Sequence, residues 1–223
     1  NSRYGRMSNP YFRNALIKNY MYKGPVLEWY MRAKMRLDGY YDMWDRILPR
    51  QGVITDVGCG YGQLALALSI LSPERRVYGF DYDSEKIALA SHSFLAGGSV
   101  TFGHVDMRDC ELPESDAFVF NDSLHYVDER TQEAVLRYCA GRLKAGGCII
   151  VRDADASDKE RHDAVKRIEK FSTGILGFNK TEESLTFVGR EWMAGLAEDL
   201  GMSLKTRLCD ERTSETVYLL TRK

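Results

Sequence analysis

The feature that most constrains the fold is a glycine-rich turn between a short apolar segment and a helix-forming one. Residues 53–57, Val-Ile-Thr-Asp-Val, form a β-branched run typical of a buried parallel strand, and residues 63–71 are apolar and helix-prone. Gly58, Gly60 and Gly62 lie between them. Glycine permits positive φ and close backbone approach to a ligand, and the following helix presents free N–H groups. The turn therefore indicates a ligand site.

A second strand, predicted over residues 77–80, ends in an acidic residue. Asp81 follows this strand about 20 residues after the turn, where a carboxylate can accept both ribose hydroxyls of a nucleoside. A lone glycine triplet is often only a tight turn. Two motifs at this spacing, each at the end of a predicted strand, favour a nucleoside-cofactor site instead.

The spacing of the glycines indicates which nucleoside is bound. A dinucleotide site favours G-x-G-x-x-G with a pyrophosphate on the helix N-terminus, whereas this chain has G-x-G-x-G with Asp56 two residues before the first glycine. An aspartate there would repel a pyrophosphate and suits a cation. In these two motifs the sequence resembles the class I S-adenosylmethionine-dependent methyltransferases. A nicotinamide-dependent oxidoreductase is the disfavoured alternative.

The resemblance implies S-adenosyl-L-methionine as the cofactor and gives it further contacts. Asp106 ends the third predicted strand, where the family places an acid that accepts from the adenine amino group, followed by a residue that packs on the ring. A solvated loop acid is the alternative. Asn121 and Asp122 end the fourth strand, beside the transferring methyl in the family. The expected cofactor contacts are Asp56, Gly58, Cys59, Gly60, Gly62, Asp81, Tyr82, Asp106, Met107, Asn121 and Asp122.

The chain after the turn alternates predicted strands and helices, which favours the α/β class. Further strands are predicted at residues 100–105, 116–121, 147–152, 204–209 and 216–221, and helices at residues 85–90, 130–143, 159–171 and 190–200. Repeated β-α units predict a doubly wound, Rossmann-like sheet. The resemblance, which covers roughly residues 52–223, implies seven strands with a C-terminal antiparallel hairpin.

Residues 1–50 differ in composition from residues 51–223, the predicted methyltransferase domain. They are rich in tyrosine and tryptophan, and their Lys and Arg outnumber their Asp and Glu. A helix over residues 26–48 would place Trp29, Ala33, Leu37 and Tyr40 or Tyr41 on one face, a stripe typical of core cover. The resemblance implies a substrate lid, suited to an aromatic or anionic acyl substrate. We expect a helical lid or cover.

His125 is the candidate catalytic residue. It lies in the segment Asn-Asp-Ser-Leu-His-Tyr, residues 121–126, and the ordinary pKa of histidine, about 6.5, suits a general base for a phenol, carboxylic acid or amine. Methyl transfer depends more on an aligned nucleophile, so shaping the pocket is the alternative role. The segment lacks the N/D-P-P-Y/F motif of family members that act on base amines, which counts against a nucleic-acid partner. We expect His92 and His104 to pack and His162 to be solvated.

Composition limits the other possibilities. The chain has 223 residues, a net charge of −1 and 44% hydrophobic residues, ordinary for one soluble α/β domain with an elaboration. No apolar run approaches the roughly 20 residues that span a bilayer, and no signal peptide opens the chain, so we expect a cytoplasmic location. The 5 cysteines lack C-x-x-C spacing, which argues against a zinc site or a disulfide framework, and we expect no metal.

These features predict a bacterial methyltransferase that transfers the sulfonium methyl in line to a small-molecule or lipid-linked acceptor. A catalytically silent binding module of the same fold is the alternative. Residues 12–25 and 40–41 also resemble the methyltransferase part of bacterial proteins that join a transporter-like segment, a lysophospholipid-type acyltransferase and a methyltransferase. That resemblance implies an acyl or aryl-polyene lipid precursor as acceptor. It also implies a domain of a longer, membrane-attached protein, in keeping with the lack of an initial Met.

Overall fold

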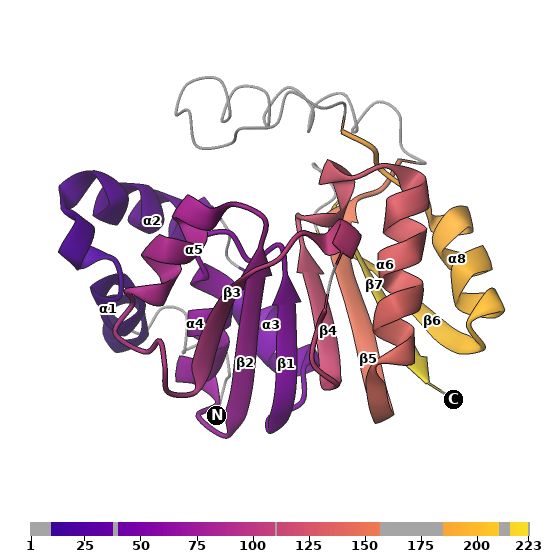
Figure 1. Cartoon of the computed structure of the whole chain (residues 1–223), viewed down its shortest axis with the longest axis horizontal. Helices are drawn as coiled ribbons and strands as arrows, with labels where there is room; N and C mark the ends of the chain where they lie inside the picture. The colour runs from indigo at the N-terminus through magenta and orange to yellow at the C-terminus, as the bar shows by residue number, and fades with distance from the viewer. Residues whose placement is uncertain (1–9, 38–39, 110, 157–184, 210–214, 223) are drawn as a thin grey trace. The chain divides into compact units, whose positions relative to one another are not determined.

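The computed structural model describes residues 10–37, 40–109, 111–156, 185–209 and 215–222, and it contains a seven-stranded sheet (Figure 1). The strands are β1 (Gly52–Val57), β2 (Arg75–Asp81), β3 (Val100–His104), β4 (Ser115–Asn121), β5 (Leu143–Ala154), β6 (Met202–Leu208) and β7 (Glu215–Arg222). Their order in the sheet is β3-β2-β1-β4-β5-β7-β6. β1, β2 and β3 pair in parallel, whereas β7 pairs antiparallel with both β5 and β6. This topology confirms the predicted doubly wound sheet and its antiparallel C-terminal hairpin.

The chain divides into two compact units, Asn1–Ala117 and Phe118–Lys223. The helices described in the first unit are α1 (Pro10–Lys18), η2 (Met21–Lys23), α2 (Pro25–Leu37), α3 (Tyr41–Ile47), α4 (Gln63–Leu71), α5 (Ser84–Ser91) and η3 (Met107–Asp109). α4 and α5 both pack against β2 and β3, while α1 and α3 pack against α4. The N-terminal helices therefore cover the helix that directly follows the glycine-rich turn.

The first β-α unit forms where the sequence predicts it. Ile54 on β1 and Leu66 on α4 are fully buried, as expected for a parallel strand and the helix that lies on its sheet. At the start of α5, the Asp83 side chain accepts the backbone N–H groups of Glu85 and Lys86, so it caps two of the helix's free donors. This cap, two residues after the end of β2, fixes the start of α5 at Ser84.

The predicted helix over residues 26–48 is wrong in its extent and in its buried face. The described residues form two helices, α2 and α3. Leu27, Met31 and Met35 are the buried stripe of α2, whereas Trp29 is 64% exposed. Two residues correspond to about 200° around a helix, so a stripe through Leu27 leaves Trp29 on the opposite face. Unbranched methionine fills irregular gaps well, and Met31 and Met35 rather than Trp29 are on the buried face.

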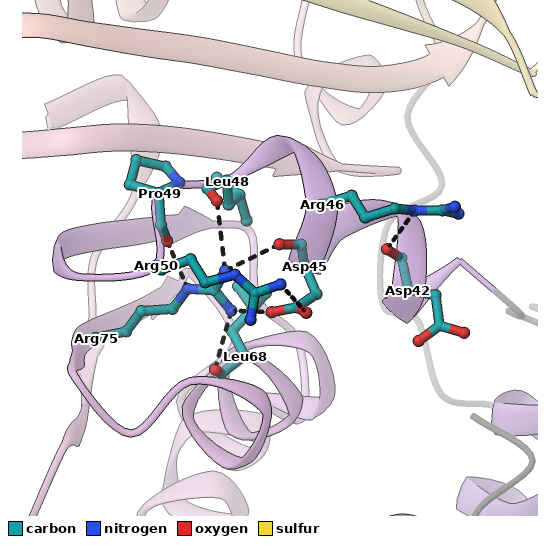
Figure 2. Close-up of polar contacts among 8 residues, drawn as sticks. All are labelled: Asp42, Asp45, Arg46, Leu48, Pro49, Arg50, Leu68 and Arg75. Carbon is teal, nitrogen blue, oxygen red and sulfur yellow. Dashed lines mark hydrogen bonds and ion pairs between the residues drawn. The ribbon is translucent and has the colours of Figure 1, made fainter. Parts of the chain in front are cut away.

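A buried ion pair joins α3 to the start of β2 (Figure 2). Arg75 is almost wholly buried, and its Nη1 donates to Asp45 Oδ1 at 2.9 Å. The same guanidinium donates to the carbonyl oxygens of Asp45, Leu48, Pro49 and Leu68. Burial lowers the pKa of Arg75, and Asp45 opposes that shift. Arg75 thus supplies donors to carbonyls at and just after the end of α3, and it is a second donor to Leu68 O, which also accepts the Ser72 N–H.

The second unit is the antiparallel half of the sheet with its own helices. These are η4 (Leu124–Tyr126), α6 (Glu129–Gly141), which packs on β5, and α8 (Arg190–Asp199), which packs on β6. Asp128 caps α6 by accepting the Thr131 N–H at 2.7 Å. The predicted charged helix at residues 159–171, with His162, lies outside the described residues. In the part of the chain that the structure describes, no helix is long and apolar enough to cross a membrane.

Candidate functional site

Asp81 organises the glycine-rich loop in the first unit. Its Oδ2 accepts the backbone N–H of Gly60 at 2.7 Å, and its Oδ1 accepts that of Asp83 at 2.9 Å. The N–H groups of Gly58 and Cys59 donate to Phe80 O at 2.7 and 2.9 Å. Each oxygen of an ionised carboxylate has about two lone-pair sites, so Asp81 can accept two further donors. It is 7% exposed, as a ligand contact at a strand end should be.

The glycines of the loop differ in what surrounds them. Gly58, Gly60 and Gly62 have φ values of +78°, +55° and +75°, which L side chains rarely adopt. A Cβ on Gly62 would collide with the Phe102 ring, whereas a Cβ on Gly60 would have no described heavy atom within 4 Å. Gly62 is therefore needed for packing and conformation. Gly60 is needed for conformation and borders open space.

Asp56 is a buried carboxyl beside this loop. It is 1% exposed, and burial followed by the charge of Asp81 raises its pKa to about 7, while Lys34 opposes the shift. Among the described residues, no donor lies within hydrogen-bond distance of its Oδ2. A buried acceptor without a donor is costly, so this site fits a ligand that brings a donor or a positive charge.

Two neighbours of the loop have features that sequence reasoning did not identify. Burial raises the pKa of the Cys59 thiol well above its ordinary value, which favours an inert thiol over a nucleophile. Lys86 Nζ lies 5.8 Å from the centroid of the Tyr61 ring and 3.9 Å from Asp83 Oδ2. The position of Lys86, three residues after the helix cap, is the sequence signal that could have placed this cation beside the loop.

The segment after β3 lies beside the end of β2. The Val105 N–H donates to Asp81 O at 3.0 Å, which places Asp106 and Met107 close after the end of β2. The side chain of Arg108 binds the Asp106 carboxylate, with Nη2 to Oδ2 at 2.6 Å, and these bonds lower the pKa of Asp106. An adenine amino group would share Asp106 with Arg108. The Asp-x-Arg spacing is the signal that could have revealed this pair.

Tyr82, His92 and His104 lie at the protein surface. Tyr82 is exposed, and its carbonyl oxygen lies 2.8 Å from His104 Nε2. His104 itself is exposed at the end of β3, and His92 is exposed at the end of α5 with Nδ1 2.7 Å from Ala88 O. The expectation of packing is wrong for His104, whereas the His92 ring, although exposed, stacks on Tyr22 with centroids 5.8 Å apart. Both are surface groups at the ends of elements.

In the second unit, a buried arginine organises the end of β4. Arg152 donates to Asn121 Oδ1 at 3.1 Å and to Glu215 Oε2 at 2.7 Å, and it also pairs with Asp122. Asp122 has a φ of +53°, which is unusual for a residue other than glycine, although aspartate adopts it more readily than most. Sequence reasoning missed Arg152, although an arginine after Ile-Ile-Val in a predicted buried strand was a visible signal.

His125 pairs with a carboxylate that was also missed. Its Nδ1 lies 2.8 Å from Asp153 Oδ1, which also accepts the Ala154 N–H at 2.9 Å. The ring is buried, and it stacks on Phe187 with centroids 4.7 Å apart. The arrangement fixes the ring orientation and has the geometry of a carboxylate-supported general base.

In the described residues, no group of three or more His, Cys, Asp or Glu side chains could hold a metal ion.

The sequence is similar to those of known methyltransferases. A family model described as a methyltransferase domain matches residues 54–147. Trans-aconitate 2-methyltransferase of Mycolicibacterium gilvum is 34% identical over 129 residues, 57% of this chain and 48% of that protein. The chain thus spans about half the length of the relatives it matches.

Solved structures of methyltransferases have a fold similar to that of this chain. An O-methyltransferase family protein from Burkholderia thailandensis superposes with a TM-score of 0.66 at 22% identity, over 86% of this chain and 58% of that one. Magnesium protoporphyrin IX methyltransferase from Synechocystis, solved with bound SAH, gives 0.63 at 18% identity, over 86% and 84%. The chain therefore has the fold of these methyltransferases, and residues 54–147 match the methyltransferase-domain model. The predicted Rossmann-like methyltransferase fold is confirmed, whereas the domain bounds and the individual site residues stay predictions.

Proposed function

We propose that this chain is an S-adenosylmethionine-dependent methyltransferase that acts on a small-molecule acceptor. The observation that carries the proposal is the Asp81 carboxylate, which holds the glycine-rich loop and keeps acceptor capacity for two more donors. A nucleoside ribose supplies two hydroxyl donors. The family match over residues 54–147 supports the enzyme class.

The residues of the first unit fit the charges of this cofactor. S-adenosylmethionine, when bound, supplies an electrophilic methyl on a sulfonium. Asp81 would hold the ribose hydroxyls, and the unsatisfied Oδ2 of Asp56 would accept from the ammonium. Gly60 has the open space that a ligand needs. A pyrophosphate would meet the charge of Asp81 and, above about pH 7, that of Asp56, so the residues favour S-adenosylmethionine over a dinucleotide.

The proposed acceptor is a small carboxylic acid or phenol. The matching relative is named for trans-aconitate, a small carboxylic acid, and this supports a small polar acceptor here. His125 would take the acceptor's proton if the acceptor binds as its neutral form. With Nδ1 donating to Asp153, a neutral imidazole has its lone pair on Nε2, and that nitrogen would receive the proton. A carboxylate acceptor would need no base, and His125 would then only shape the pocket.

Further predictions concern whether the acceptor is linked to a lipid and where in the cell the protein is located. A lipid-linked or aryl-polyene acceptor, a longer membrane-attached protein and a cytoplasmic location stay predictions from the sequence. A hydrophobic acceptor would require apolar lining beyond the polar groups described above. Assaying acyl and aryl acids of increasing chain length against trans-aconitate tests this point, since a lipid acceptor predicts a KM that falls as the chain lengthens.

The decisive experiment separates three functions in one series. Calorimetry with S-adenosylmethionine and with NAD identifies the cofactor. Incubation with methyl-labelled S-adenosylmethionine and a panel of carboxylic acids and phenols, followed by mass spectrometry, then identifies transfer. Labelled product together with S-adenosylhomocysteine supports the proposal. Binding of S-adenosylmethionine without product from any acceptor supports a silent module, and preferential binding of NAD would overturn the cofactor assignment.

A further inference from the structure

A tyrosine of the N-terminal segment touches the glycine-rich loop directly. Tyr20 lies between α1 and η2, and its side-chain hydroxyl donates to the backbone carbonyl of Tyr61 at 2.9 Å. Tyr61 is the residue between Gly60 and Gly62. The Tyr20 side chain is fully buried, although it is separated from Tyr61 by 41 residues in the chain. The segment before β1 therefore contributes a hydrogen bond to the backbone of the loop.

This hydrogen bond acts on a residue that lies between two glycines of the loop. Gly60 and Gly62 on either side of Tyr61 have few steric limits on φ and ψ, so the unbound loop has alternative conformations open to it. The Gly60 N–H is fixed by Asp81, and the Tyr61 carbonyl is fixed by Tyr20. The two bonds therefore hold the peptide units on either side of the Gly60–Tyr61 peptide, one through Asp81 and the other through Tyr20.

Tyr20 is itself held firmly. Leu16 and Ile17 on α1 are buried, and the side-chain oxygen of Asn19 accepts the Leu95 N–H at 3.2 Å. Burial raises the pKa of Tyr20 well above its ordinary value, so the hydroxyl keeps its proton and remains a donor at neutral pH. The Tyr30 ring adds an edge contact to the Tyr61 ring at 5.9 Å between centroids.

We propose that Tyr20 is a positioning residue for cofactor binding, through which docking of α1 and binding of the cofactor favour one another. This inference rests on the proposed function. When only a fraction of molecules has the loop in the binding-competent conformation, the apparent Kd rises as that fraction falls. Loss of the Tyr20 hydrogen bond lowers the fraction. By linkage, a cofactor that selects the ordered loop stabilises the docked α1 by the same factor.

The chain offers a closely matched control. The hydroxyl of Tyr22, two residues further on, donates to the backbone carbonyl of Leu89 on α5 at 2.7 Å. Tyr20→Phe and Tyr22→Phe each remove one tyrosine hydroxyl that donates to a backbone carbonyl, but only Tyr20 bonds to the loop. Calorimetry with S-adenosylmethionine should show a Kd about threefold to tenfold higher for Tyr20→Phe than for the parent. The Kd of Tyr22→Phe should equal that of the parent.

A second measurement keeps the inference testable if Tyr20→Phe does not fold. Amide hydrogen exchange of the parent, with and without S-adenosylhomocysteine, should show slower exchange over residues 16–23 when the ligand is bound. If the folded Tyr20→Phe variant binds as the parent does, or the parent's exchange over residues 16–23 does not respond to ligand, the coupling is absent. A parent that binds no S-adenosylmethionine would instead overturn the proposed function, so the two failures are distinguishable.

Discussion

The Asp81 carboxylate accepts the backbone N–H of Gly60 at 2.7 Å, so the proposed ribose-binding residue also fixes the loop that would contact the cofactor. If Asp81 also binds the ribose as proposed, it would have two roles, one in the ligand-free protein and one with ligand bound. Substitutions at Asp81 should change both stability and affinity.

Asp81→Ala should weaken S-adenosylmethionine binding at least tenfold and lower the melting temperature. Hydrogen bonds to a charged group contribute about 1.5–3 kcal/mol each, and the substitution removes those to the ribose as well as those to the loop. Asp116→Ala is the matched control, because Asp116 Oδ2 accepts the Val53 N–H at 2.7 Å at the opposite end of β1. Calorimetry and thermal melts of both variants check this. Equal affinities for Asp81→Ala and the parent would contradict the assignment.

Asp56 should make folding stability depend on pH. Its pKa is raised from 3.8 to about 7, first by burial and then by the charge of Asp81. Between those values the folded protein retains a proton that the unfolded chain releases, so the free energy of unfolding falls as pH rises from about 4 to about 7. Above about pH 7 this contribution is constant.

Asp56→Asn keeps the shape of the side chain and cannot ionise, which isolates the effect. Denaturant unfolding at pH 5 and pH 8 should show a smaller loss of stability for Asp56→Asn than for the parent. Identical losses in the two proteins would mean that another group titrates. If the affinity for S-adenosylmethionine rises between pH 6 and pH 7.5, the rise should occur in the parent and not in Asp56→Asn.

The Asp45–Arg75 pair should be important for folding and unimportant for chemistry (Figure 2). Removing one partner of a buried ion pair leaves an uncompensated charge and costs about 3–5 kcal/mol. Asp45→Asn should therefore unfold at much lower denaturant concentration. Asp42→Asn, on the same helix, should cost less than about 1 kcal/mol, the usual size of a helix-dipole contact. A similar denaturant midpoint for the two variants would show that the hydrogen bonds from Arg75 to backbone carbonyls stabilise the fold without the Asp45 charge.

The sequence predicted the sheet better than it predicted the side-chain partners. Strand and helix positions follow from local apolar periodicity and glycine placement, which act over a few residues and are visible in one chain. The side-chain partners of Arg75, Arg152 and His125 lie 28 to 63 residues away in the chain, so local patterns do not contain them. The buried face of α2 was misjudged for a related reason, because Trp29 and Leu27 are equally apolar and only the packing partner decides between them.

We expect residues 12–20 of the N-terminal segment to act as a structural cover rather than as a lid. Leu16, Ile17 and Tyr20 are buried, and burying a large apolar side chain contributes about 1.5–3 kcal/mol. Deleting residues 1–22 should therefore expose the surface of α4 and cause aggregation, against the expectation for a simple lid. Deleting residues 1–9 should leave a folded protein. Circular dichroism and light scattering of the two truncations test this, and a soluble, folded protein lacking residues 1–22 would restore the lid interpretation.

His125 and Asp153 should affect turnover and leave cofactor affinity unchanged. General-base catalysis contributes about 10²–10⁴-fold, so His125→Gln should lower kcat by that range with a phenol acceptor, while the Kd for S-adenosylmethionine stays at the parent value. Asp153→Asn should lower kcat less, because an amide can still accept from Nδ1 but no longer stabilises the protonated ring. His92→Gln, at an exposed position, is the control. If His125→Gln keeps the parent kcat on every acceptor that the parent methylates, the ring only shapes the pocket, and alignment of the acceptor accounts for the rate.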